Sequence, residues 1–192
     1  MRIGIYPGSF NPVHVGHMVI AGYMAEFSDL DEVWMVVSPR NPLKMTKDML
    51  QDYHRLELVK LAVGNNKKIK ASDVEFKLSK PSYTINTIQF LKEKFPVNEF
   101  VLIMGEDNLS TFDQWKDYKA LLDLCMIYVY PRLNAGETEF HSHPRVKLIK
   151  EVPVMEISAT FIRNSIRDKK DVRYMLNPDV LERIEELGFY QK

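Results

Sequence analysis

Short apolar runs alternate with longer amphipathic segments along the chain. Six of these runs are predicted to be strands, at residues 2–6, 33–38, 69–76, 100–104, 125–130 and 146–150. Most are continuous rather than alternating, which is typical of strands buried on both faces of a sheet. The spacing of apolar positions predicts helices at residues 15–27, 52–63 and 84–95, and after Asn177.

The ends of the last helix are marked by three residues. Asn177 is expected to cap its first turn, Pro178 to occupy that turn, and Gly188 to end the helix. One residue of the predicted helix at 52–63 has an open role. Arg55 within it is either part of the helix surface or faces a ligand, and the sequence does not separate these alternatives.

Alternating strands and helices predict an α/β fold, here a Rossmann-like doubly wound parallel sheet with helices on both faces. We expect one domain over residues 1–192, with a small C-terminal helical region from about 158 to 192. Ligands of such sheets bind beyond the carboxyl ends of the strands, where the strand order reverses. This rule directs attention to the loops at 7–14, 38–46 and 105–112.

Composition narrows the functional classes. Lysine plus arginine and aspartate plus glutamate each number 26, so the formal net charge is zero. This balance argues against general electrostatic binding to nucleic acid or to an anionic membrane. Cys125 is the single cysteine, expected to be buried, and it excludes an internal disulfide. No apolar stretch approaches the length of a membrane span, and the N-terminus lacks a signal-peptide core, so we expect a soluble cytoplasmic protein.

The loop after the first predicted strand, GSFNPVHVGH, combines glycines and histidines. Gly8 permits a tight turn, and Gly16 lets the following helix begin close to the sheet or a ligand. That helix would direct its free N–H groups at an anion. His14 and His17 are three residues apart, so both side chains can face the same anion.

Three interpretations of the histidines compete. A metal site would need a third protein ligand, and the sequence offers none at a matching local spacing. Two structural histidines that bond backbone carbonyls are the ordinary alternative. The pattern favours phosphate binding with transition-state stabilisation, because histidine donates hydrogen bonds and titrates near neutral pH. Ser9 and Asn11 are candidate neutral donors beside them.

A second motif, ISATFIR at residues 157–163, has the features of a helix start. Ser158 is a good N-cap, and its helix would again present N–H donors. Thr160 and Arg163 share one face, from which the guanidinium could reach a phosphate. The alternative for Arg163 is a surface position on an amphipathic helix.

Both motifs resemble the signatures of the nucleotidylyltransferase superfamily. His14, Gly16 and His17 stand at the positions of its H-x-G-H loop, and ISATFIR resembles its second signature. Across the whole chain, the resemblance is to bacterial nicotinate mononucleotide adenylyltransferases. SPRNPLK, SYTINTI and MGEDNLSTFDQW are similar to three further segments of that family.

The resemblance implies roles for matched residues. The ATP-binding set is Gly8, Ser9, Phe10, His14, Gly16, His17, Gly105, Asp107, Ile157, Ser158, Thr160 and Arg163. The mononucleotide-binding set is Ser9, Asn11, Lys44, Tyr83, Thr84 and Trp115. The implied catalytic residues are His14, His17, Arg163 and Lys44.

Within these sets, the resemblance implies that Trp115 stacks on the pyridine ring, that Thr84 receives the pyridine carboxylate, and that Asp107 holds ribose hydroxyls. Each has a plainer alternative: Trp115 as core packing, Lys44 as a solvated side chain, and Asp107 as a helix cap. Tyr83 either packs or lines the pocket.

Three residues outside these sets are also notable. Glu106 departs from the resembling family, which more often has a small residue there, so we expect its side chain to point away from the ligand. His141 and His143 are expected to be loop or surface histidines.

The implied activity is transfer of the adenylyl group of ATP to nicotinate mononucleotide. Mg²⁺ is expected to arrive with ATP, and no metal is assigned to a protein site. The sequence leaves the oligomeric state open, a homodimer included. Rival hypotheses are an adenylyltransferase for phosphopantetheine, a cytidylyltransferase, and a non-catalytic nucleotide-binding module. A dehydrogenase is disfavoured because the loop lacks the G-x-G-x-x-G spacing.

Overall fold

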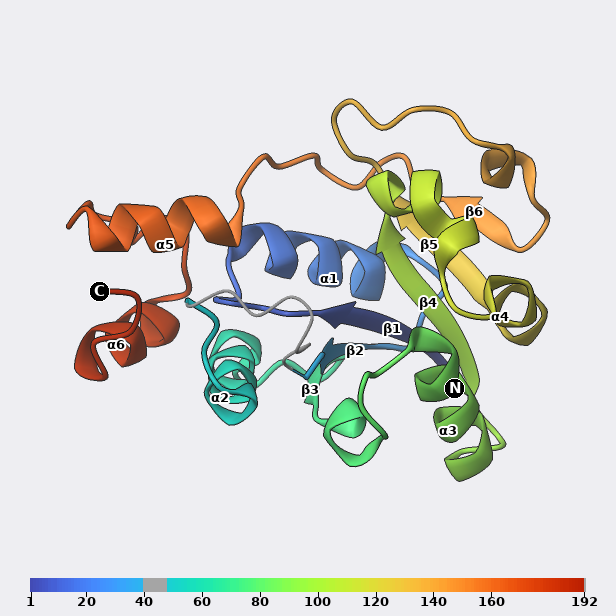
Figure 1. Ribbon diagram of the computed structural model, residues 1–192, viewed down its shortest axis with the longest axis horizontal. Helices are drawn as coiled ribbons and strands as arrows, with labels where there is room; N and C mark the ends of the chain where they lie inside the picture. The colour runs from blue at the N-terminus through green and yellow to red at the C-terminus, as the bar shows by residue number, and fades with distance from the viewer. Residues whose placement is uncertain (40–47, 192) are drawn as a thin grey trace.

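The computed structural model describes residues 1–39 and 48–191. Its strands are β1 (Arg2–Gly8), β2 (Glu32–Val37), β3 (Ile69–Ser72), β4 (Glu99–Gly105), β5 (Met126–Tyr130) and β6 (Val146–Leu148). Its helices are α1 (Val15–Phe27), α2 (Asp52–Val63), α3 (Thr84–Lys94), α4 (Tyr118–Leu124), α5 (Ala159–Arg167) and α6 (Pro178–Glu186). The strands form one parallel sheet in the order β3-β2-β1-β4-β5-β6, which confirms the predicted doubly wound α/β fold (Figure 1).

Helices cover both faces of the sheet because alternate strand residues supply two apolar surfaces. On β1, Ile3 and Ile5 pack into the cluster that contains the apolar residues of α3 and α4. Tyr6 on the same strand packs into the other cluster, which includes residues of α1, α2, α5 and α6. The central strands β1, β4 and β5 are therefore buried on both sides, as their continuous apolar runs predict, whereas the edge strands β3 and β6 are partly exposed.

The strand order reverses between β1 and β4. The chain proceeds from β1 outward to β3, then returns to β4 on the other side of β1 and continues to β6. The loops that follow β1 and β4 therefore diverge from neighbouring strand ends and leave a crevice between them. The sheet places two of the three suspected loops at this point.

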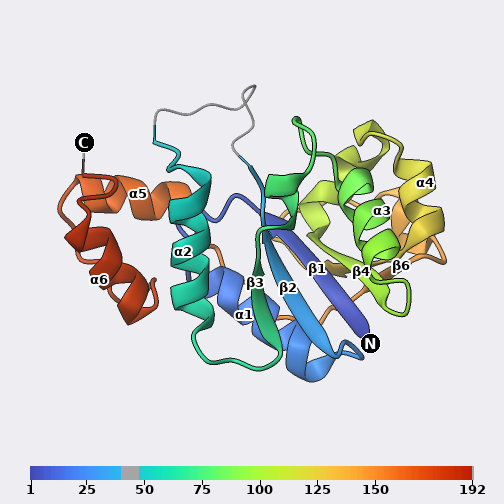
Figure 2. The same cartoon turned by 90° about the horizontal axis from the view of Figure 1, so that it is seen from below.

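The C-terminal helices α5 and α6 lie at one end of the molecule, and α6 packs against α2 (Figures 1 and 2). Asn177 caps α6 by accepting a hydrogen bond from the Asp179 N–H at 2.9 Å, and Gly188 adopts a positive φ of 61° directly after the helix. Both predicted boundaries of this helix are confirmed.

The third strand is shorter than predicted. It ends at Ser72, and residues Val74–Lys77 form a 3₁₀ turn instead of continuing the strand. The turn buries Glu75, whose carboxylate accepts a hydrogen bond from the Thr87 hydroxyl at 3.1 Å. Burial raises the pKa of Glu75. A partner distant in sequence therefore overrides the local strand pattern.

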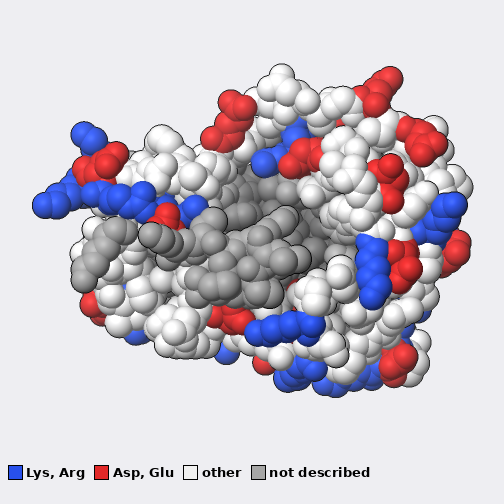
Figure 3. Space-filling model, viewed as in Figure 1, with Lys and Arg blue, Asp and Glu red and all other residues white. Residues whose placement is uncertain are grey.

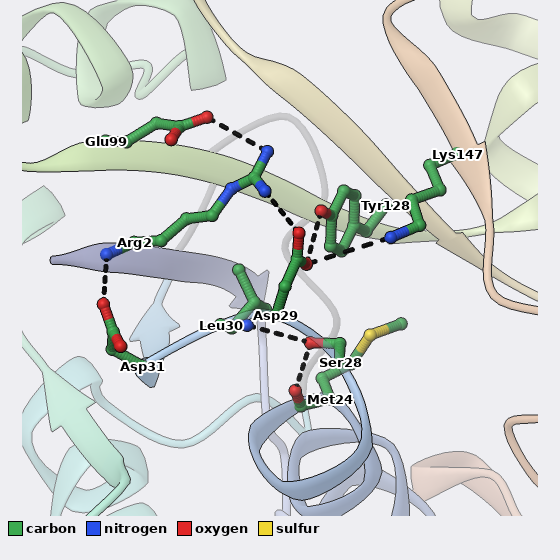
Figure 4. Close-up of polar contacts among 9 residues, drawn as sticks. All are labelled: Arg2, Met24, Ser28, Asp29, Leu30, Asp31, Glu99, Tyr128 and Lys147. Atoms are coloured by element: carbon green, nitrogen blue, oxygen red, sulfur yellow. Dashed lines mark hydrogen bonds and ion pairs between the residues drawn. The ribbon is translucent and has the colours of Figure 1, made fainter.

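A cluster of charged residues ties the connection between α1 and β2 to the strands near their amino ends (Figure 4). Asp29 in that connection accepts a hydrogen bond from the Tyr128 hydroxyl at 2.6 Å and pairs with Arg2. Lys147 Nζ lies 3.9 Å from the same carboxylate, and Arg2 also pairs with Glu99 at 3.1 Å. This end of the sheet is opposite the crevice, so we assign the cluster to stabilising the fold.

No helix in the described part of the chain is both long enough and apolar enough to span a membrane.

Candidate active site

The loop after β1 brings two histidine rings together at the start of α1. The ring centroids of His14 and His17 are 3.7 Å apart, and their planes are inclined by 32°. Phe10 supports His17 from one side, with its ring centroid 5.0 Å away. A Cβ on Gly16 would lie 3.1 Å from the His14 ring, so a larger residue at this position would press on that ring. The three-residue spacing therefore places both rings on one side of the helix start, as predicted.

Hydrogen bonds define the tautomer of His17. The His14 backbone N–H donates to Nδ1 of His17 at 3.3 Å, so Nδ1 is an acceptor and the proton of a neutral ring lies on Nε2. His14 Nδ1 is buried and has no hydrogen-bond partner among the described residues. A buried polar atom without a partner is uncommon and marks a position where a functional role is expected.

Both histidines are neutral at pH 7. Burial, followed by the positive charge of Arg132, lowers the pKa of His14 to about 4. The pKa of His17 is also well below its ordinary value, because of burial and then the neighbouring His14 and Arg132. From the sequence we expect both histidines to titrate near neutral pH. The structure corrects this expectation, because the pKa of each ring is lowered. The imidazole rings of His14 and His17 therefore serve as neutral hydrogen-bond donors.

This neutrality predicts loss of stability on acidification. The unfolded chain protonates His14 below about pH 6.5, whereas the folded protein resists until about pH 4. Across this window the unfolded state binds the extra proton, so the free energy of unfolding falls with decreasing pH by roughly 1 kcal/mol per unit for this group. Urea unfolding at pH 7, 6 and 5 should show a steeper loss for the wild type than for His14→Gln. Equal slopes would contradict a neutral, buried His14.

The second motif packs against the first, although Arg163 and Asn11 are 152 positions apart in the sequence. Arg163 on α5 donates from Nη1 to the Asn11 carbonyl at 2.8 Å and from Nη2 to the Thr160 hydroxyl at 3.2 Å. Ser158 caps α5 by accepting from the Phe161 N–H at 3.1 Å, which confirms the predicted cap. Arg163 is therefore half-buried between the two motifs rather than a surface residue.

Two neighbouring cavities lie where the motifs meet. The smaller has a volume of 190 Å³ and is lined by Tyr6, His14, Gly16, His17, Ile20, Tyr130, Arg132, Met155, Ile157, Ser158 and Ala159. The larger has a volume of 300 Å³ and is lined by Asp107, Arg132, Leu133, Val154, Met155, Glu156, Ile157 and Ser158. Arg132 and Ser158 are among the residues common to both, so the two cavities are adjacent. They place Asp107 near the histidines and the start of α5.

Arg132 is the site residue that the sequence analysis missed. It follows β5 closely, in a loop outside the three that the sequence singled out. Its Nε lies 3.5 Å from Asp107 Oδ1, and its charge acts on both histidines. The sequence does contain one indication of this role. Arg132 comes just after the carboxyl end of a buried strand, and ligands bind at that edge of a parallel sheet.

Other residues of the expected set have structural roles here. We expected Asn11 to offer donors to a ligand, but its side chain is buried. Its Nδ2 donates to the Asp48 carbonyl at 3.0 Å, and its Oδ1 accepts from the Leu50 N–H and the Tyr190 hydroxyl at 3.1 and 2.8 Å. Asn11 therefore fixes the loop against the C-terminal region.

The remaining members of this loop are arranged as follows. Ser9 is exposed, and Phe10 is buried with a positive φ of 46°. A Cβ on Gly8 would meet the Phe10 ring at 2.8 Å, so glycine is required there for packing within the loop. A Cβ on Gly105 would collide with the Asp107 carboxylate.

The residues expected to bind a mononucleotide lie around the start of α3 and after β4. Thr84 begins α3, and Tyr83 precedes it with a partly exposed ring. Lys116 Nζ lies 4.5 Å from the Tyr83 ring centroid, which joins this segment to the one that carries Trp115. Trp115 is half-buried, with its ring 5.5 Å from that of Phe112.

Two further residues of this region had open interpretations. Lys44, the remaining expected residue, lies outside the described residues. The helix-cap alternative for Asp107 is wrong, because Gly105 is the N-cap of the 3₁₀ segment that follows β4.

His141 is more than a loop histidine, which corrects our expectation. Its Nε2 lies 3.0 Å from Oε1 of Glu106. His143 accepts a hydrogen bond from the Arg145 N–H at 3.2 Å. In the described part of the chain, no three His, Cys, Asp or Glu side chains are grouped so that they could hold a metal ion. Cys125 is buried as expected, and burial raises its pKa to about 11.

Acidic and basic side chains are interspersed over the face shown in Figure 3. Arg132 brings a positive charge to both cavities, and Asp107 and Glu156 also line the larger one. Together with the doubly wound sheet, two converging motifs of neutral and cationic donors form a site whose chemistry suits a polyphosphate, as in the nucleotidyltransferases.

Comparison with known proteins agrees with this class. A family model described as cytidylyltransferase-like matches residues 5–165. A probable nicotinate-nucleotide adenylyltransferase of Flavobacterium psychrophilum is 52% identical over 194 residues, with 100% of both chains covered. One of Bacteroides fragilis is 44% identical, with 95% of this chain and 90% of the relative covered. The chain therefore belongs to the cytidylyltransferase-like nucleotidyltransferases and, within them, to the nicotinate-nucleotide adenylyltransferase family.

A solved structure shares the fold at much lower identity. The Plasmodium falciparum nicotinic acid mononucleotide adenylyltransferase complexed with NaAD superposes with a TM-score of 0.81 at 19% sequence identity. The alignment covers 98% of this chain and 97% of that chain. The arrangement of strands and helices is therefore common to distant proteins.

Proposed function

We propose that this protein transfers the adenylyl group of ATP to nicotinate mononucleotide and releases nicotinate adenine dinucleotide and pyrophosphate. The observation that carries the proposal is the convergence of two motifs on one pair of cavities. His14 and His17 come from the start of α1, after the loop that follows β1, and Ser158 comes from the start of α5. Both motifs supply donors for phosphate oxygens, and neither supplies an acid–base pair.

The chemistry follows from this donor set. A 5′-phosphate oxygen of the mononucleotide attacks the α-phosphorus of ATP, the bond from that phosphorus to the bridging oxygen breaks, and pyrophosphate leaves with the electron pair. The nucleophile is already an anion at neutral pH, so the reaction needs no general base. The protein has to position two polyanions and offset the negative charge that develops on the phosphates.

We assign the parts of the reaction to residues as follows. Nε2–H of His17 donates to a phosphate oxygen, and the start of α5 beneath Ser158 offers backbone N–H groups to the triphosphate. Arg163 braces the histidine loop through the Asn11 carbonyl and carries a positive charge close to it. Mg²⁺ enters as part of the substrate MgATP, where phosphate oxygens and water are its natural ligands.

The decisive experiment measures pyrophosphate release from MgATP with nicotinate mononucleotide and nicotinamide mononucleotide offered in parallel. We expect release with the acid and much less with the amide. Equal use of both would keep the class of enzyme and remove the proposed carboxylate pocket near Thr84. No release with either acceptor would overturn the proposed function and favour a different acceptor, such as phosphopantetheine, or a nucleotide-binding module.

Trp115→Ala is expected to weaken binding of the mononucleotide. Stacking of a base on an aromatic side chain contributes about 1–3 kcal/mol, so KM for nicotinate mononucleotide should rise by roughly fivefold to a hundredfold while KM for MgATP changes little. Trp115→Phe keeps an aromatic face and should recover most of the affinity. An unchanged KM in Trp115→Ala would place this side chain in core packing against Phe112.

A further inference from the structure

Glu106 directly precedes Asp107, which lines the larger cavity, and a carboxylate here that faced the triphosphate would repel it. The structure shows where its charge is directed. Oε1 lies 3.0 Å from His141 Nε2, and Oε2 accepts a hydrogen bond from the Arg132 backbone N–H at 3.3 Å. Both oxygens therefore have partners in the segment that follows β5. This explains how a carboxylate is accommodated where the resembling family more often has a small residue.

His141 is held in one tautomer by its own segment. The Thr138 backbone N–H donates to Nδ1 of His141 at 3.0 Å, so Nδ1 is an acceptor and Nε2–H is the donor to Glu106. Phe140, which directly precedes His141, is buried, and its ring lies 5.2 Å from that of Phe112. The turn that presents His141 is therefore anchored by packing, and it can serve as a fixed support for Glu106.

Arg132 connects this support to the candidate active site. Its backbone is bonded to Glu106, and its side chain lines both cavities. The ion pair with Asp107 joins Nε of the guanidinium to Oδ1 at 3.5 Å. A positive charge at this point lies near His14 and His17 and lowers the pKa of both. A guanidinium so placed has the charge and the paired donors that suit phosphate oxygens.

We propose that Arg132 contacts the phosphates of MgATP and that Glu106 and His141 are positioning residues which hold Arg132 at the site. The inference rests on the proposed function, because it takes MgATP as the ligand. It assigns a purpose to two residues that lie outside both signature motifs. Glu106, supported by His141, holds the backbone of Arg132, so these two residues affect the substrate only through Arg132.

A double-mutant cycle tests the proposal through KM for MgATP and through the Kd of a non-hydrolysable MgATP analogue measured by titration calorimetry. Arg132→Ala should raise both by about tenfold or more, because a charged hydrogen-bond donor is lost. KM for nicotinate mononucleotide should stay within about twofold. Glu106→Ala should raise KM for MgATP by about threefold to tenfold in the wild-type background and have no further effect in Arg132→Ala.

The control is His143→Ala, which removes a second histidine and one hydrogen bond from the same segment without touching Glu106. It should leave the Kd of the MgATP analogue unchanged, whereas His141→Ala should raise it in the same direction as Glu106→Ala. Thermal unfolding checks that each variant is folded at the assay temperature. If Glu106→Ala does not fold, the nearly isosteric Glu106→Gln takes its place, since its amide NH2 group donates and so replaces one of the two accepting oxygens.

Three outcomes overturn the inference. These are an unchanged Kd in Arg132→Ala, an unchanged Kd in the Glu106 variants, and additive effects of the two substitutions, which would show that Glu106 acts independently of Arg132. Failure of the proposed function is distinguishable from these. In that case the wild type itself releases no pyrophosphate with nicotinate mononucleotide, whereas binding of the MgATP analogue still reports on Arg132.

Discussion

Replacing His17 with alanine is expected to lower kcat about a hundredfold or more, with a much smaller change in KM for MgATP. Removing one donor aimed at developing charge typically costs this much in rate. His17 suits the role because its Nδ1 is bonded to the His14 backbone, which leaves Nε2–H as the donor. The measurement is steady-state pyrophosphate release at saturating concentrations of both substrates.

A matched variant separates hydrogen bonding from charge. His17→Gln places an amide N–H at a similar reach without an ionisable ring. Since burial keeps the pKa of His17 well below its ordinary value, we expect a neutral donor to recover part of the lost rate. A kcat for His17→Ala near that of the wild type would remove His17 from transition-state stabilisation. No recovery in His17→Gln would indicate that the imidazole becomes protonated when the triphosphate binds.

Arg55→Ala is expected to lower the free energy of unfolding by about 3–5 kcal/mol, the usual cost of removing one member of a buried ion pair. The side chain of Arg55 is fully buried. Its guanidinium donates to the Leu50 carbonyl at 3.2 Å, to Asp52 Oδ1 at 2.7 Å, and to the Ser9 carbonyl in the histidine loop. Without it, the Leu50 and Ser9 carbonyl groups lose this donor and Asp52 loses one of its partners, so both stability and the position of the loop should suffer.

The measurement is urea unfolding, with Lys60→Ala as the control. Lys60 is a cationic residue on the exposed face of the same helix, and its replacement should change the free energy of unfolding by no more than about 0.5 kcal/mol. Arg55→Lys should remain destabilised, because one ammonium group cannot reproduce the fork of donors. A loss below about 1 kcal/mol in Arg55→Ala would show that water can replace the guanidinium.

The difference between expectation and structure is largest where partners come from distant segments. Arg55 had two open interpretations on sequence grounds, a helix surface or a ligand contact, and it is neither. It is buried and holds Ser9, which lies 46 positions away in the chain. The short third strand has the same cause, because Glu75 turns inward to meet Thr87 on α3. Periodicity describes one segment at a time and carries no information about such partners.

The sequence by itself determined the class of fold, the alternation of strands and helices, the capped ends of the last helix, and the two signature motifs. Each depends on residues close together in the chain, where side-chain spacing and backbone preference act directly. Only the tertiary structure decided that Arg132 lines the site, that His14 and His17 are neutral, and that Glu106 is directed to His141. These properties arise from the strand order, which brings β1, β4 and β5 side by side and lets Arg163 reach Asn11 across 152 positions of sequence.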